Sequence, residues 1–405
     1  MNVSKTRPFH RGTTQGVVGV PAVTDAFGLP VLDEMVPVSP VAMRLVSDGI
    51  KTLWARIVAA NPQADTRPLL LSYDVHPSPD GPVLIEVNTN AGGVLTAMRA
   101  ARMGNECCAD WEQGLLEARL LALFRHDLLG PDPKKAGVVA IVDDQLMSQP
   151  LLAEMMALAG LLRPHAEDVR VIDAAELKYS DGRLRHEGKP LDRVYWRSTD
   201  FLLSEPQHEP VRRAVLEGTT ILAPSAEAYV AIADKRRMVE WSKAPELARD
   251  EAAGLSFRVA ETLPMNQRTV EAWYADRSDW VFKPVSGFAS RGVYVGKSIS
   301  RKKLTELPVD AYLAQRYAPH PVIDRDGKEW KYDIRFFADR GQIIGAAARV
   351  FHGQVVGMRE PGSGFAPIRV DETCCLIGAL AAARGKPPNA GTRMPASSRD
   401  GPTDL

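Results

Sequence analysis

The sequence WVFKPVSGFASRGVYVG, residues Trp280–Gly296, decides the fold prediction. Two apolar runs flank a loop of mostly small residues, Ser286–Gly292, which is the pattern of a β-hairpin. Lys283 precedes this loop on a strand, whereas the lysine of the GxxxxGKS or GxxxxGKT phosphate loop follows its glycines and opens a helix. Exposed N–H groups of the loop can surround phosphate oxygens while Lys283 supplies a positive charge. The stretch therefore predicts a flap over bound phosphates, and the alternative is an ordinary hairpin with a surface lysine.

A second stretch, LLLSYDVHPSPDGPVLIEVNTN (Leu69–Asn90), contains two apolar strands joined by a Pro-Asp-Gly turn. Glu86 and Asn88 project from the same face of the second strand, because side chains alternate along a strand. A hairpin partner can place Asp74 beside them. Two carboxylates and an amide oxygen are hard ligands that suit Mg²⁺ held partly by nucleotide phosphates. These three residues are candidate metal ligands, and a solvated strand face is the alternative.

Composition argues against several classes of protein. The chain has 405 residues, enough for two or three domains, and its 50 basic residues balance 50 acidic ones. Zero net charge argues against nucleic-acid binding, which usually needs a basic excess. No apolar run is long enough to span a membrane, and the first residues lack the apolar core of a secretory signal. We therefore expect a cytoplasmic protein without a membrane partner. Its four cysteines form two adjacent pairs, Cys107-Cys108 and Cys374-Cys375, which we interpret as free thiols.

The rest of the chain shows two further patterns. Strands alternate with helices over residues 136–223, which predicts a parallel-sheet α/β domain. Residues Tyr332–Val350 form a predicted hairpin. Asp333 and Arg335 share one face of its first strand, and Arg349 lies at the end of the second. Taken alone, these charges are also explained by surface ion pairing.

Four motifs accompany the hairpin at Lys283: Asp234-Lys235, Gln315-Arg316-Tyr317, Tyr332-Asp333-Ile334-Arg335 and Glu86-Val87-Asn88. Together they resemble the ATP-grasp superfamily, especially its glutathione synthetase-like and glutathionylspermidine synthase-like branches, over most of residues 69–370. Glu-x-Asn, normally the last motif, lies upstream of both lysines, as in circularly permuted ATP-grasp families. The resemblance implies an α/β fold with two ATP-grasp nucleotide-binding lobes, circularly permuted, and an α/β parallel-sheet domain on the substrate side.

The resemblance also implies a division of the chain into four parts. Residues 1–110 would complete the ATP-grasp lobe and supply its metal-binding strand. Residues 111–230 would form a Rossmann-like domain, and residues 231–370 would form the nucleotide-binding lobes. Residues 371–405 lie beyond the resemblance, and their content of Pro, Gly, Ser and charge predicts a disordered tail.

Individual residues acquire expected roles from the same resemblance. The expected catalytic residues are Lys283, Arg335 and Arg349, the last by binding the γ-phosphate and the acyl phosphate. The expected metal ligands are Asp74, Glu86 and Asn88. The expected nucleotide-binding residues are Lys235, Lys283, Ser286, Gly287, Ser290, Arg291, Gly292, Gln315, Arg316, Tyr317 and Asp333. The expected substrate-binding residues are Arg197, Arg359, Ser363 and Gly364.

Two of these assignments have a qualification in the sequence. The family often carries Glu in the hinge strand where Arg316 stands. Arg197 ends a predicted strand that faces the active site in the family, but a structural pair with Asp200 is the alternative.

The implied function is an ATP-dependent carboxylate–amine or carboxylate–thiol ligase that uses ATP and Mg²⁺. ATP would phosphorylate a carboxylate of an amino-acid-like or peptide-like small molecule, and the amine or thiol of a second small molecule would displace phosphate. A phosphotransferase on the same scaffold and a nucleotide-binding regulator without turnover are the alternatives, and a homodimer is left open. The permuted arrangement makes one strong demand, that the Glu86 strand share a sheet with Asp333 and Arg349.

Overall fold

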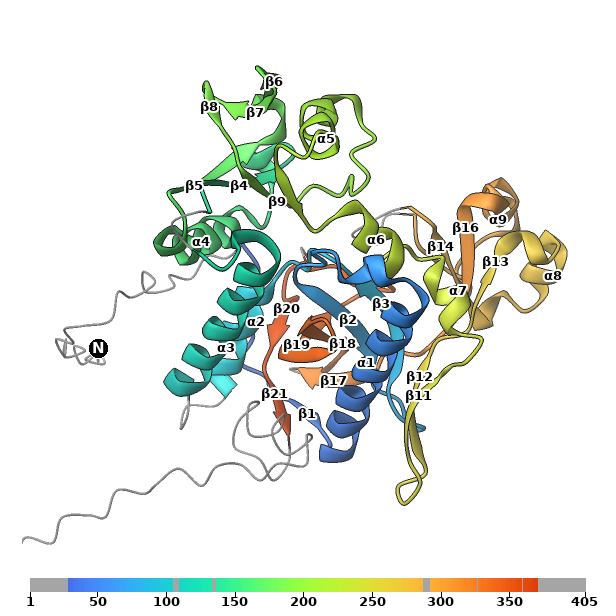
Figure 1. The fold of residues 1–405 in the computed structure, drawn as a ribbon. Coiled ribbons are helices and arrows are strands. Elements are labelled where there is room, and N and C mark those ends of the chain that lie inside the picture. Colours follow the sequence, from blue (N-terminus) through green and yellow to red (C-terminus); the bar gives the residue numbers. More distant parts are fainter. Residues whose placement is uncertain are drawn as a thin grey trace, which may run out of the picture.

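An eight-stranded sheet forms the centre of the molecule (Figure 1). The computed structural model describes residues 28–104, 109–132, 136–286, 292–325, 327–358 and 360–370. Seven strands follow the spatial order β11-β12-β3-β2-β18-β19-β20, and β17 pairs with β18 beside this path. Their bounds are β2 Leu71–His76, β3 Val83–Asn88, β11 Glu246–Asp250, β12 Leu255–Val259, β17 Val322–Arg325, β18 Lys328–Asp339, β19 Gln342–Phe351 and β20 Gly364–Ala366. The central sheet therefore collects strands from distant parts of the chain.

Helices cover both faces of the central sheet. Helix α1 (Pro40–Ala60) lies on one face and begins at Ser39, whose hydroxyl accepts the N–H of Ala42 at 3.1 Å. It approaches closely at Gly49, where an added Cβ would lie 2.1 Å from the Phe257 ring. Helices α2 (Val94–Gly104) and α3 (Ala109–Phe124) cover the other face (Figure 1). Strands β1 (Val36–Val38) and β21 (Ile368–Val370) pair in parallel, which joins the two ends of the described chain.

The hairpin of β18 and β19 is the longest pairing in the sheet. It turns at Arg340-Gly341, with Arg340 in the left-handed region at φ +55°. Arg340 also donates to Asp127 at 2.7 Å, which joins the turn to the helical segment Arg125–Leu129. The hairpin predicted from the sequence is confirmed.

Strand pairing brings the Glu86 strand to the charged hairpin. In antiparallel register, Glu86 lies opposite Asp74, Asp74 lies opposite Arg335, and Asp333 lies opposite Arg349. The expectation that Glu86 shares a sheet with Asp333 and Arg349 is thus confirmed. Arg335 and Phe337 are two residues apart on β18, so their side chains share one face of the sheet. Because Phe337 packs in the core beneath α2, the charged residues lie on the α2 face.

A small lobe contains the stretch that opened the sequence analysis. Its sheet has the order β13-β16-β14-β15, and helices α8 and α9 cover it. The bounds are β13 Thr262–Pro264, α8 Val270–Ala275, β14 Trp280–Pro284, β15 Tyr294–Val295, α9 Arg301–Glu306 and β16 Tyr312–Arg316. The predicted hairpin is confirmed by pairing of Phe282 with Tyr294. Residues 287–291 of its loop lie outside the described residues.

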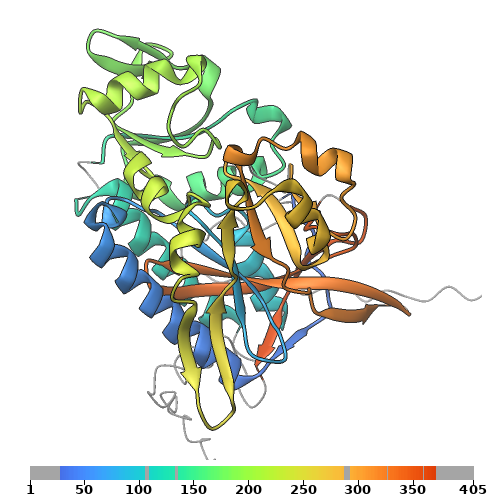
Figure 2. The same cartoon turned by 90° about the vertical axis from the view of Figure 1, so that its right-hand side faces the viewer.

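A separate parallel sheet lies above the central sheet in Figures 1 and 2, as the alternating pattern predicted. Its order is β10-β9-β4-β5, with bounds β4 Val138–Asp143, β5 Asp168–Asp173, β9 Arg193–Trp196 and β10 Ile221–Ala223. Helix α4 (Leu152–Leu162) packs on one face and α5 (Glu209–Leu216) on the other. A small antiparallel sheet beside it has three strands, β6 Lys178–Ser180, β7 Arg183–His186 and β8 Lys189–Pro190.

Two short helices, α6 (Ala226–Ile232) and α7 (Arg237–Trp241), lead from the parallel sheet to strands β11 and β12 of the central sheet, and the small lobe follows. Asp234 and Lys235 lie in the turn between α6 and α7, directly before α7 begins at Arg237. Within the described residues, no helix is both long enough and apolar enough to cross a bilayer.

Candidate active site

Four charged side chains form an ionic network on β2, β18 and β19. Arg335 binds Asp74 with two parallel bonds, Nε to Oδ1 at 2.8 Å and Nη2 to Oδ2 at 2.7 Å. Arg349 donates from Nη2 to Asp74 at 3.0 Å and from Nε to Asp333 at 2.8 Å. The two arginines therefore hold two buried carboxylates in fixed positions.

The charges in this network stabilise one another strongly. Burial alone would raise the pKa of Asp74, but the guanidinium groups of Arg335 and Arg349 hold it well below its usual range. Asp333 and Asp74 raise the pKa of Arg349, although burial opposes them. Asp74 and Arg349 are therefore ionised at neutral pH. The interpretation of these charges as a weak surface feature is wrong, because Asp74, Asp333 and Arg349 are buried.

Glu86 and Lys235 form a second charged pair next to the network. Lys235 Nζ lies 3.0 Å from Glu86 Oε1, which joins the turn after α6 to strand β3. Burial would raise the pKa of Glu86, but Lys235 and Lys283 lower it below its usual value. The two lysines thus lie near the same carboxylate, although they come from different parts of the chain.

Lys283 has a different kind of partner. Its Nζ donates to Oε1 of Gln315 at 2.6 Å, and no ion pair joins it to any carboxylate of the described residues. Gln315 is held in turn by Ile85 O at 3.1 Å and by Thr262 Oγ1 at 3.2 Å. Burial lowers the pKa of Lys283 to about 8, and Glu86 only partly offsets that effect.

These lysines border a small pocket between the central sheet, the α6–α7 turn and the small lobe. Strand β12 pairs with β3 only as far as Leu84, so the edge of β3 from Ile85 onward is open to the pocket. The lining combines Glu86, Lys235, Lys283 and Gln315 with apolar side chains that the sequence analysis did not identify: Ile85, Val87, Ile232, Met238, Trp241 and Leu313. Strand alternation could not reveal them, because they come from four separate segments.

The three predicted metal ligands lie on paired strands, and their oxygens suit a hard divalent cation. Glu86 uses Oε1 for Lys235, and the amide nitrogen of Asn88 donates to Ser72 at 3.4 Å, so Glu86 Oε2 and Asn88 Oδ1 can accept further bonds. Asp74 already accepts bonds from both arginines, and its remaining lone pairs are those available to a cation. Among the described residues there is no cluster of three or more His, Cys, Asp or Glu side chains that could hold a metal ion.

The other predicted nucleotide residues lie in different surroundings. Of the hinge residues, Gln315 lines the pocket, whereas Arg316 pairs with Glu261 at 2.9 Å and lies over the Trp280 ring. Tyr317 follows β16, and its backbone N–H donates to the backbone carbonyl oxygen of Asp279 at 2.7 Å. Ser286 and Gly292 flank the loop whose other predicted residues, Gly287, Ser290 and Arg291, lie outside the described residues.

Arg197 lies at the end of β9 and is buried against the turn that precedes α2. Its Nη1 donates to the carbonyl oxygen of Asn90 at 3.1 Å, to the side-chain oxygen of Asn90, and to the hydroxyl of Tyr195 at 3.0 Å. The alternative pairing with Asp200 is wrong, because Asp200 accepts instead from His208 at 2.7 Å and from the backbone of Glu205 at 2.8 Å.

The predicted substrate loop is only partly described. Arg359 lies outside the described residues. Ser363 is fully buried with no hydrogen-bond partner for its hydroxyl among them. Gly364 begins β20, and a Cβ there would lie 2.8 Å from Leu32, so this position needs glycine for packing.

The sequence analysis also did not identify two histidines near the network. His76 follows Asp74 on the same face of β2, and its ring centroid lies 4.0 Å from that of His320. Burial lowers the pKa of His76 to about 4 and that of His320 to about 3. Both imidazoles are therefore neutral beside the cations. The spacing Asp-x-His was the only sequence signal for this pair.

Comparison with known proteins identifies the fold but no close relative. No protein-family model matches the sequence, and no curated protein matches it. A solved structure from Methylobacillus flagellatus KT, provisionally described as a gamma-glutamylcysteine synthetase, matches with a TM-score of 0.51 at 13% identity. The match covers 84% of this chain and 91% of that one. The ATP-grasp ligase PsnB, solved with its minimal precursor, matches with a TM-score of 0.33 at 17% identity, over 61% of this chain and 83% of that one.

Proposed function

We propose that this chain, which has the α/β ATP-grasp fold predicted from its sequence, is an ATP-dependent ligase that joins a carboxylate to an amine or a thiol. The carrying observation is the environment of Lys283, a largely buried cation with a neutral partner in a mainly apolar pocket. Such a cation is stabilised by an anionic ligand, and the apolar lining suits the flat face of a nucleotide base. ATP has both features.

In this proposal, Lys235 and Lys283 bind the phosphates, and Gln315 holds Lys283 toward them. Ser286 and Gly292 begin and end the loop that covers the phosphates. Arg316, Tyr317 and Asp333 have smaller roles in nucleotide binding in this proposal. Arg316 is paired with Glu261, and Asp333 holds Arg349. Asp333 then acts as a positioning residue for the arginine that binds the transferred phosphoryl group.

Asp74, Glu86 and Asn88 would hold Mg²⁺, which when bound offsets negative charge on the phosphates. Two features of these residues support this assignment. Glu86 lies directly opposite Asp74 in the strand register, and Asn88 follows on the same face of β3. Of the three, Glu86 lines the lysine-bordered pocket.

The proposed chemistry needs no nucleophile from the protein. A substrate carboxylate oxygen attacks the γ-phosphorus of ATP, the bond from that phosphorus to the β–γ bridging oxygen breaks, and ADP and an acyl phosphate form. An amine or thiol then attacks the acyl carbon, loses its proton, and displaces phosphate. Lys283, Arg335 and Arg349 act by neutralising charge on the transferred group and by positioning it. The ionic network holds both arginines ready for this role.

Substrate binding is proposed for the neighbouring residues of the parallel sheet and of the β20 loop. Arg197, and with it Arg359, Ser363 and Gly364, would bind an amino-acid-like or peptide-like carboxylate. Arg197 and Arg335 both donate to the same short turn, at Asn90 and Gly92, which supports a substrate site next to the phosphoryl-transfer site.

The test is a screen for ADP release with Mg²⁺–ATP against amino acids, short peptides and polyamines, followed by hydroxylamine trapping. Formation of a hydroxamate that depends on the carboxylate substrate is expected, because hydroxylamine intercepts an acyl phosphate. ADP release with a stable phosphorylated product and no hydroxamate would identify a phosphotransferase instead. ATP binding without any substrate-dependent ADP release would leave a nucleotide-binding regulator.

A further inference from the structure

An aromatic pair joins the parallel-sheet unit, residues 136–223, to helix α6. Phe201 follows strand β9, and its ring stacks on the ring of Tyr229 with the centroids 4.4 Å apart and the planes inclined by 11°. Both residues are partly buried. Figure 1 shows α6 directly below the parallel-sheet unit, so the stack spans the boundary between that unit and the rest of the chain.

The backbone on either side of Phe201 is fixed by a tight turn. The N–H of Leu203 donates to the carbonyl oxygen of Asp200 at 3.1 Å, which closes the turn. The side chain of Leu203 is buried in the core beneath α5, and its carbonyl oxygen accepts from Arg212 at 2.7 Å. Phe201 therefore projects from a rigid support.

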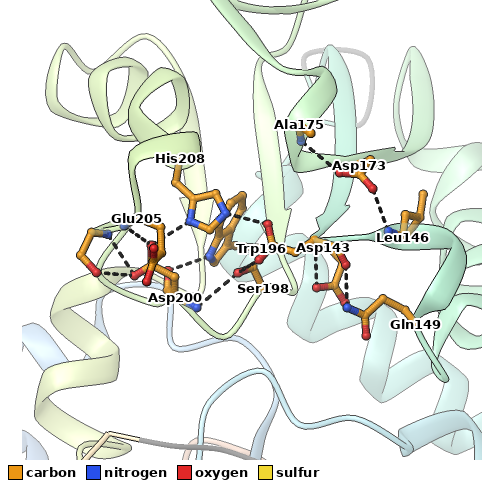
Figure 3. Close-up of polar contacts among 12 residues, drawn as sticks. Asp143, Leu146, Gln149, Asp173, Ala175, Trp196, Ser198, Asp200, Glu205 and His208 are labelled. Atoms are coloured by element: carbon orange, nitrogen blue, oxygen red, sulfur yellow. Dashed lines mark hydrogen bonds and ion pairs between the residues drawn. The ribbon is translucent and has the colours of Figure 1, made fainter.

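An ionic contact holds Asp200, as Figure 3 shows. The fully buried ring of His208 lies between two carboxylates, with Nδ1 2.7 Å from Asp200 and Nε2 2.7 Å from Asp144. An imidazolium, which has two N–H donors, satisfies both carboxylates. Asp200 also accepts the backbone N–H of Glu205 at 2.8 Å, and its carbonyl oxygen accepts from Trp196 Nε1 at 3.0 Å. The residue before Phe201 is thus held by both its side chain and its backbone.

Tyr229, on the other side of the stack, holds the turn that carries Lys235. Its carbonyl oxygen accepts the N–H of Ala233 at 2.8 Å and that of Asp234 at 3.1 Å, and these bonds close the end of α6. Burial would lower the pKa of Lys235, but Glu86 and then the Tyr229 hydroxyl raise it above its usual value. Tyr229 is therefore connected to Lys235 through the backbone and also lies near it in space.

Helix α6 is fixed on its other face by the core of the central sheet. Ala228, Ala231 and Ile232 are buried in that core, and the hydroxyl of Ser225 caps the start of the helix by accepting the N–H of Ala228 at 3.1 Å. Phe201 supports the helix from the side of the parallel-sheet unit. Removing its ring would leave the core contacts intact and loosen the end of α6 next to Tyr229.

We propose that Phe201 is a positioning residue for Lys235. By stacking on Tyr229 it holds the end of α6, and with it the turn that presents the Lys235 ammonium to the phosphates. The inference rests on the proposed function in one respect, that Lys235 binds ATP. It makes ATP affinity depend on the parallel-sheet unit, although no described residue of that unit lines the lysine-bordered pocket.

The first experiment measures amide hydrogen exchange without nucleotide. Phe201→Ala should speed exchange at Ala233 and Asp234 by about twofold to tenfold, the range that corresponds to the energy of one aromatic pair. Phe201→Tyr keeps the ring and should exchange as wild type does. Leu202→Ala is the matched control, because it truncates an apolar side chain in the same turn that is 51% exposed.

The second experiment measures Mg²⁺–ATP affinity by calorimetry in a double-mutant cycle. Phe201→Ala should weaken binding by about twofold to tenfold, with the energy of the aromatic pair as the upper limit. In the Lys235→Met background the same change should have no further effect, because the side chain that Phe201 positions is already absent. A stack that only stabilised the fold would not produce this dependence on Lys235.

Failure of the positioning role and failure of the proposed function have different signatures. Unchanged exchange at Ala233 and Asp234 in Phe201→Ala would overturn the positioning role, and so would an equal loss of ATP affinity with and without Lys235. Wild-type protein that binds no ATP would overturn the phosphate role of Lys235 and with it the proposed function. The exchange data would still decide in that case whether Phe201 fixes the turn.

Discussion

Lys283 Nζ lies 2.6 Å from Gln315 Oε1, a neutral atom, although Glu86 borders the same pocket. Glu86 is instead paired with Lys235 at 3.0 Å. The structure thus keeps one lysine neutralised and leaves the charge of the other largely uncompensated. An uncompensated cation in a pocket costs folding free energy and is retained where an anion binds.

Replacing this lysine should remove activity without unfolding the protein. Lys283→Met is expected to lower substrate-dependent ADP release by about a hundredfold or more, the scale for loss of one electrostatic contact to a transition state. Its thermal unfolding should be unchanged or improved, because a desolvated charge is removed. Lys302→Met, which alters an exposed lysine on α9, is the control. Near-normal turnover in Lys283→Met would return Lys283 to the role of an ordinary hairpin residue.

ATP affinity should depend on pH through the same group. Burial lowers the pKa of Lys283 to about 8, so its ammonium is lost as the pH rises through that value. Calorimetric titrations from pH 7 to above the pKa should therefore show weaker ATP binding at the alkaline end. Lys283→Arg, which stays protonated, should remove this pH dependence. The same alkaline weakening in Lys283→Arg would assign the titration to another group.

ATP binding should require Mg²⁺. Chelation with EDTA is expected to weaken ATP binding by about tenfold or more, because the proposed ligands contact the metal while the metal contacts the phosphates. Asn88→Ala should reduce the difference between the two conditions, since it removes one proposed ligand and leaves Lys235 and Lys283 in place. Equal affinity with Mg²⁺ and with EDTA in the wild-type protein would count against the assignment of Asp74, Glu86 and Asn88.

The ionic network should contribute to stability as well as to activity. Arg349→Gln leaves the buried carboxylate of Asp333 without its partner and should lower the free energy of unfolding by about 3 kcal/mol at neutral pH. The double variant Asp333→Asn/Arg349→Gln should recover part of this loss. Arg316→Gln, which breaks an exposed pair with Glu261, should cost under about 1 kcal/mol in urea unfolding. Equal losses for Arg316→Gln and Arg349→Gln would mean that the network is not buried in solution.

The stability of the parallel-sheet unit should fall as the pH rises through the pKa of His208. Burial alone would lower the pKa of His208, but its bonds to Asp144 and Asp200 raise it above the ordinary value of 6.5. The resulting stabilisation is complete below the unfolded pKa and is lost as the pH rises through the folded pKa. Urea unfolding of His208→Gln should lack this decline, whereas His352→Gln, an exposed histidine, should keep it. A decline that persists in His208→Gln would place the titration elsewhere.

Much of the architecture was predictable because it depends on local patterns. Side-chain alternation along Val83–Asn88 places Glu86 and Asn88 on one face of the strand. Turn residues at Arg340-Gly341, between two apolar strands, predict a hairpin. Strand β8 was not predictable, because it is only two residues long. The position of Lys235 in a turn was not predictable, because an Asp-Lys pair suits a helix start and a turn before a helix almost equally well.

The sequence by itself determined the elements, the faces of the strands and the residue types available for phosphate and metal binding, because these follow from interactions between near neighbours. Only the tertiary structure decided which charges meet. Asp74 and Arg335 are 261 residues apart. Lys235 and Glu86 form an ion pair although they belong to different sequence motifs. Whether a charged group is paired or left for a ligand depends on which strands lie side by side, and that is set by burial over the whole chain.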